Sequence, residues 1–208
     1  MTYQSPNPIE FEDVEAILDW LEKFWKKRIA YQLGKIDLPD EPDNSPCLSS
    51  EIKVELKVFL DLLRASLDMT MWKVLEFLKK IPDDEKEKRN IHFPMSLEDA
   101  ITIGKIKEYI ENDKIKQLIV DFVINNDCQL RLLQKLNNQS KHRSLNSVHL
   151  KIEKTFPEDE SSSQMSMSVH FSIEAEGLYE DQNMYAFIDS FREFIVELVL
   201  KLDEELKR

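Results

Sequence analysis

Apolar residues recur every three or four positions in four long stretches of the chain, at about 9–33, 50–80, 114–136 and 183–206. This spacing places them along one side of an α-helix. Each stretch therefore predicts an amphipathic helix whose apolar side packs against the others, as in a helical bundle.

Local signals predict where these helices end. Gly34 is placed to cap the first helix, and Pro82 is expected to close the second. The charged run at 83–89 is expected to be a solvated loop. Polar residues at 125–127 interrupt the third stretch and predict a break into two helices.

Between the third and fourth stretches the pattern changes to strict alternation of apolar and polar residues. Two such runs, joined by a polar loop, predict an antiparallel β-hairpin at 148–174. We therefore expect an α+β fold, mainly a helical bundle with an antiparallel β-hairpin before the C-terminal helix. The chain, 1–208, is expected to form a single domain, with 1–8 disordered and 35–50 a proline-rich linker.

The first helix is rich in aromatic residues. Trp20, Trp25 and Tyr31 have helical spacing, which is more typical of core packing than of a ligand-binding box. The apolar stripe expected to face the core of the protein comprises Val14, Ile17, Leu18, Leu21, Phe24, Trp25 and Ile29.

Composition narrows the class of protein. The formal net charge is −12 and the sequence pI is about 4.9, so binding to nucleic acid or to an anionic membrane requires a local basic patch. Cys47 and Cys128 match no zinc or redox spacing, and we expect free thiols. No signal peptide and no membrane-spanning run is evident, which predicts a cytoplasmic protein without a membrane partner.

A dense polar cluster at 137–143 is the strongest candidate for a site, because it gathers amide, imidazole, ammonium and guanidinium groups. Neighbouring cations disfavour the charged form of His142 unless a carboxylate compensates. Asp68, at the edge of the second helix and one turn after Arg64, is the candidate carboxylate. The predicted binding site or polar network comprises Arg64, Asp68, Asn138, Lys141, His142 and Arg143.

These residues carry a resemblance to a family of uncharacterised bacterial proteins. Residues 59–72 (FLDLLRASLDMTMW) resemble its "LRxxLD" helix, and 93–95 (Phe-Pro-Met) match its "FP[IM]" segment. Residues 133–143 are similar to its signature L-x-x-L-[ND]-x-x-D-K-H-R, with Ser140 where the family usually has Asp. The role of that carboxylate is therefore not carried over. The family has no established activity, so the resemblance implies an architecture and a site, and no reaction.

A weaker resemblance is to HEPN-type ribonucleases, helical bundles with an active site of the form R-x(4–6)-H. Five residues separate Arg143 from His149. Under this reading the catalytic candidates are Arg143, His142 and His149. The leading hypothesis is instead a non-enzymatic binding or assembly module built around the Lys-His-Arg cluster. The alternative is a HEPN-like endoribonuclease in phage defence or a toxin–antitoxin system.

The remaining expectations concern ligands and partners. The histidines have no metal-ligand spacing and no nucleotide-binding motif is present, so we expect neither a metal nor a cofactor. RNA is a partner only under the ribonuclease alternative. An exposed hairpin edge can pair with a second copy, which makes a homo-oligomer a further expectation.

Overall fold

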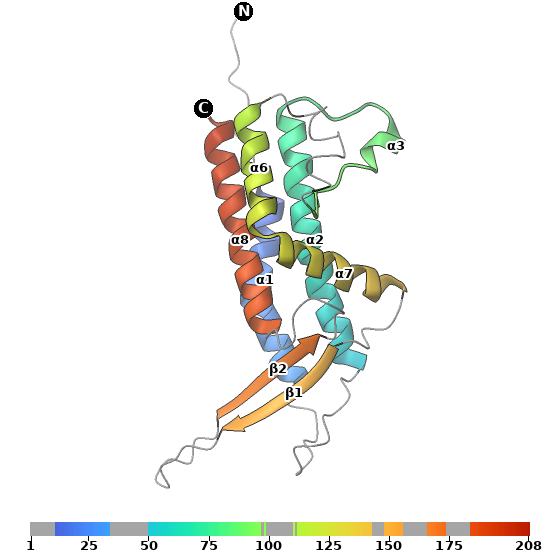
Figure 1. Ribbon diagram of the computed structural model, residues 1–208, viewed down its shortest axis with the longest axis vertical. Helices are drawn as coiled ribbons and strands as arrows, with labels where there is room; N and C mark the ends of the chain where they lie inside the picture. Colours follow the sequence, from blue (N-terminus) through green and yellow to red (C-terminus); the bar gives the residue numbers. More distant parts are fainter. Residues whose placement is uncertain are drawn as a thin grey trace, which may run out of the picture.

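The computed structural model describes residues 11–33, 50–96, 98, 110, 112–142, 148–155, 166–173 and 184–208. The expected disordered lead-in at 1–8 and nearly all of the linker at 35–50 lie outside these residues. Four long helices lie lengthwise beside one another in Figure 1. They are α1 (Glu12–Leu33), α2 (Ser50–Phe77), α6 (Asp113–Asn125) and α8 (Met184–Leu206).

Polar contacts show how the long helices are oriented. Arg28 of α1 donates to both carboxylate oxygens of Glu55 in α2, at 2.9 and 2.7 Å, and this hydrogen bonding raises the pKa of Arg28. The indole Nε1 of Trp25 lies 3.2 Å from Asp189 Oδ1 in α8, and Lys114 of α6 pairs with Glu205 of α8 at 3.3 Å. α1 therefore runs antiparallel to α2 and α8, and α6 antiparallel to α8.

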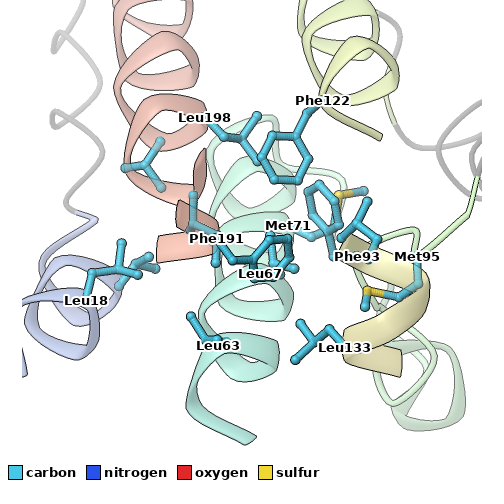
Figure 2. Packing of buried hydrophobic residues seen from close by; sticks show 14 of the residues in the cluster. Leu18, Leu63, Leu67, Met71, Phe93, Met95, Phe122, Leu133, Phe191 and Leu198 are labelled. Carbon is cyan, nitrogen blue, oxygen red and sulfur yellow. The ribbon is translucent and has the colours of Figure 1, made fainter. Parts of the chain in front are cut away.

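One hydrophobic core joins these helices. Its largest fully buried side chains include Trp25, Phe59, Phe93 and Phe191. Figure 2 shows Leu67 and Met71 of α2 between Phe191 of α8 and Phe93 of the connection after α2. In the described part of the chain, no helix is both long and apolar enough to cross a membrane.

Two further helices, α3 and α7, are described. α3 (Glu85–Lys88) is a single turn, and the side chain of its N-cap Asp84 accepts hydrogen bonds from the backbone N–H groups of Lys86 and Glu87. The expectation of a solvated loop at 83–89 is therefore corrected at these four residues. α7 (Asp127–His142) follows α6 after Asn126 and crosses α2 at a steep angle (Figure 1). The predicted break at 125–127 is confirmed.

Pro82 does not close α2, which ends five residues earlier at Phe77. Lys79 has a positive φ of 53°, its N–H bonds the carbonyl of Glu76, and the N–H of Lys80 bonds the carbonyl of Leu75. These two bonds around a left-handed residue are the Schellman motif. This helix end was not predicted from the sequence, because a glycine usually occupies the left-handed position and here that residue is a lysine.

The expected α+β class is wrong. Wherever the structure describes side chains, every regular element is a helix, and the fold class is a helical bundle. The backbone of β1 (Val148–Thr155) pairs antiparallel with that of β2 (Ser166–Ile173), but two strands provide no sheet layer. The described core is built by helices, by the connection at 91–95 and by Ile110. Alternating apolar and polar residues predict that a stretch of backbone is extended. They do not predict whether the strands form a sheet layer that packs into the hydrophobic core.

The apolar stripe predicted for α1 is corrected at Phe24, whose side chain is 46% exposed. Trp25 is fully buried as expected, whereas Trp20 is half-buried and Tyr31 is 67% exposed. α1 has a fully buried seam through Leu18, Leu21 and Trp25, and a second aromatic seam beside it that reaches solvent. Apolar periodicity alone does not separate the two seams, because the positions of one are offset from those of the other by a single residue.

Candidate functional site

Arg64 and Asp68, two members of the predicted site, form an ion pair one helical turn apart on α2. The Arg64 Nε lies 3.0 Å from Asp68 Oδ2, and both side chains are partly buried. The resemblance to the "LRxxLD" helix thus falls on two residues that contact each other, and they reach solvent at the edge of the core.

The same pair holds the backbone of the segment after α3. The N–H of Phe93 donates to Asp68 Oδ1 at 2.8 Å, and the carbonyl of Phe93 accepts from Arg64 Nη2 at 3.4 Å. Both backbone hydrogen-bonding groups of one residue are therefore held by two side chains of α2. A buried residue in an irregular segment needs such partners, because no helix or sheet supplies them.

A third residue, His92, lies near the same carboxylate. Its Nδ1 is 3.8 Å from Asp68 Oδ2, and its side chain is more than half exposed. Asp68 therefore accepts hydrogen bonds from the Arg64 side chain and from the Phe93 backbone N–H, with the His92 ring beside them.

Because its backbone is held in place, the Phe93 side chain makes a large apolar contact in a defined position. The Phe93 ring meets the Phe122 ring of α6 edge to face, with 5.5 Å between ring centroids. Met95 is also buried, and Figure 2 shows it near Leu133 of α7. We call Arg64, Asp68 and the backbone of Phe93 the α2 clamp. It seats the Phe-Pro-Met segment where α2, α6 and α7 meet.

α7 is held across α2 by leucines and one amide. Leu130, Leu132, Leu133 and Leu136 are buried, and the Nδ2 of buried Asn137 lies 3.4 Å from the carbonyl of Leu60 in α2. The predicted site includes residues of α2 and of α7, and these two helices do pack against each other. Sequence reasoning placed Asn138 in the site, but Asn138 is exposed and its neighbour faces α2.

The other predicted site residues lie at or beyond the end of α7. Lys141 and His142 are its last two residues, and their side chains lie outside the described part of the structure. Arg143 also lies outside it. The backbone of His149 is in β1, opposite Ser172, and its side chain is outside the described residues. The predicted meeting of Asp68 with His142 stays a prediction.

Three groups at this site were missed by sequence reasoning: His92, Asn137 and the Phe93 backbone. The first two had a weak signal in the sequence, since His92 precedes the Phe-Pro-Met segment and Asn137 lies inside the 133–143 motif. The third had none, because the identity of Phe93 says nothing about which side chains bind its backbone. Among the described residues, no three His, Cys, Asp or Glu side chains gather closely enough to hold a metal ion.

A cleft of about 310 Å³ lies on another face, between α6 and α8. Its polar rim includes Asp121, which accepts from Gln117 at 2.7 Å, and Glu197, which pairs with Lys201 at 2.6 Å. This volume is at the lower limit of ligand pockets, which span roughly 300–1,000 Å³. Both carboxylates are engaged by neighbours on their own helix, so the cleft does not define a ligand class.

Comparison of the chain with models of known protein families, with curated proteins and with solved structures finds no match.

Proposed function

We propose that the protein is a non-enzymatic binding or assembly module whose contact surface is the Lys141-His142-Arg143 segment at the end of α7. The observation that carries the proposal is the α2 clamp. Arg64 and Asp68 bind each other and the Phe93 backbone, so their polar groups are used inside the protein. In this proposal both residues stabilise the bundle, and the Lys141-His142-Arg143 segment contacts the partner.

The attachment of α7 supports the same reading. Buried leucines and the contact between Asn137 and Leu60 fix α7 across α2 until one turn before Lys141. A helix held this firmly presents its last turn in a defined place. Pre-organised presentation reduces the entropic cost of binding a partner.

Charge defines the chemistry of the partner. Two permanent cations and a histidine lie in three consecutive residues of a chain with a net charge of −12. Such a local reversal of sign favours binding to an acidic protein segment. We propose an acidic protein segment as the partner.

The alternative proposal, a HEPN-like endoribonuclease, draws on Arg143 and His149. Enzymes of that class place these two residues at the end of a helix. Here the interval between them runs from the end of α7 into β1. This difference favours a binding module over an endoribonuclease. RNA cleavage is therefore treated as one possible outcome of the test.

The test is a titration of the full chain with a fluorescent glutamate-rich peptide at low and high salt. We expect Lys141→Gln/Arg143→Gln to weaken binding about tenfold at low salt, because each surface cation contributes less than about 1 kcal/mol. The matched control is Lys207→Gln/Arg208→Gln, which removes a Lys and an Arg at the end of α8. Equal affinity in wild type and both variants would contradict the proposal.

A further inference from the structure

The outer face of the α1–α2 pair carries large apolar side chains that the core does not use. Phe24 is 46% exposed, and Val54 and Val58 of α2 are 60% and 39% exposed. Trp20, half-buried, lies 5.8 Å from the Phe24 ring and 5.8 Å from the ring of buried Phe59. We call Trp20, Phe24, Tyr31, Val54 and Val58 the outer face. Exposed apolar groups that cluster in this way mark contact sites.

The outer seam of α1 follows a spacing of four and three residues, as in helices that pack against a second helix. Its members are Asp13, Ile17, Trp20, Phe24, Lys27 and Tyr31. The inner seam is buried in the core of the same chain, and its members are Val14, Leu18, Leu21 and Trp25. α1 therefore carries two helix-packing seams. The inner one is covered by the described part of the chain, and the outer one is covered only in part, where Ile17 and Trp20 pack against the core.

Charge along α1 is divided between the two halves of the helix. The exposed acids Glu12, Asp13 and Glu15 occupy the beginning of the helix, and the exposed cations Lys27 and Arg28 lie near its end. A helix with this division repels a parallel copy of itself and attracts an antiparallel one. The division therefore favours a second copy of the same helix, packed antiparallel, as the occupant.

We propose that the chain forms a two-fold symmetric dimer in which the outer faces of two copies pack with their α1 helices antiparallel. With the axis at Trp20, Asp13 of one copy lies opposite Lys27 of the other, and the exchange occurs twice. Phe24 then lies opposite Ala16, an exposed small residue that leaves space for the ring. The two Trp20 side chains meet at the axis.

The size of the face meets the lower limit for a specific pair. With the axis at Trp20, α1 overlaps its copy over residues 12–28, which is about 26 Å at ~1.5 Å per residue. Two adjacent helices, each about 10 Å across, give roughly 510 Å² per copy, or about 1,000 Å² in total, which is the minimum expected of a specific interface. This inference does not depend on the Lys-His-Arg segment, whose first two residues end α7.

The first test is sedimentation of the full chain at micromolar concentrations. We expect a dimer for wild type and a dissociation constant at least about tenfold weaker for Phe24→Glu, because a charge in a closed apolar contact is strongly unfavourable. The control is Ile124→Glu, which places the same charge at a 51% exposed apolar residue of α6. A monomeric wild type, or a dimer that Phe24→Glu leaves intact, would overturn the proposal.

The second test exploits the symmetry. Asp13→Lys places like charges opposite each other at both exchanges, and so does Lys27→Asp, so each variant alone should dimerise more weakly. Mixing the two variants restores opposite charges at both positions, and the mixture should form heterodimers. Thermal melting of each variant separates this effect from any loss of the fold. Two variants that remain weakly associated after mixing would contradict the antiparallel register.

Discussion

Asp68 and Phe93 are joined by a hydrogen bond of 2.8 Å between the carboxylate Oδ1 of one and the backbone N–H of the other. The bond links α2 to a segment 25 residues further along the chain. Through it, a charged side chain at the edge of the core determines where a buried aromatic ring packs. Stability of the bundle should therefore depend strongly on this carboxylate.

Asp68→Ala should lower the free energy of unfolding by about 2–4 kcal/mol, because it leaves a buried N–H and a partly buried guanidinium without their acceptor. Urea denaturation measures the loss. Asp19→Ala is the matched control, since Asp19 forms an i,i+4 ion pair with Lys23 that is exposed on both sides. That substitution should cost less than about 0.5 kcal/mol. Equal losses would refute the structural role of the clamp.

Lys79→Gly should stabilise the protein by about 1 kcal/mol. At the end of α2 residue 79 has a positive φ, which is sterically unfavourable for lysine and not for glycine. Lys73→Gly, in the interior of the same helix, should instead destabilise by about 1 kcal/mol. Thermal melting of the two variants checks the opposite signs. A loss of stability in Lys79→Gly would show that this conformation is not maintained in solution.

Trp25→Phe should destabilise the bundle by about 2–3 kcal/mol, since it removes buried volume together with the hydrogen bond to Asp189. Trp20→Phe removes a similar volume from a half-buried position of the same helix, and should cost about 1 kcal/mol or less. Chemical denaturation of both variants gives the comparison. The order of the two effects is the decisive result, and the reverse order would contradict the assignment of inner and outer seams.

The sequence predicted the elements whose signals are local. Apolar periodicity located the long helices to within a few residues, and the polar interruption at Asn126 located the break between α6 and α7. The end of α2 at Lys79 was missed, because backbone conformation overrode the usual preference for glycine. The exposure of Phe24 was missed because it depends on which of two adjacent stripes the tertiary packing selects.

The candidate site was predictable only in part. Arg64 and Asp68 were placed in the site through their i,i+4 spacing at the edge of one helix, and contact between α2 and α7 was implied by placing Asp68 with the motif. Their ion pair with each other was not predicted. Their shared contact with the backbone of Phe93 had no signal, since it depends on the path of a connection between helices. The fold class was mispredicted because two alternating runs do not show whether a sheet layer forms.

The most direct test of the proposed function is incubation of a labelled RNA pool with wild type and with His142→Ala, with thermal melting of both proteins. We expect intact RNA with either protein, and melting temperatures that agree within about 2 °C, because a substitution on a binding surface should change stability by less than about 0.5 kcal/mol. Cleavage by wild type and not by His142→Ala, at equal melting temperature, would contradict the account and identify a ribonuclease. A variant that melts much lower would show that His142 supports the fold, and would equally contradict its place on a binding surface.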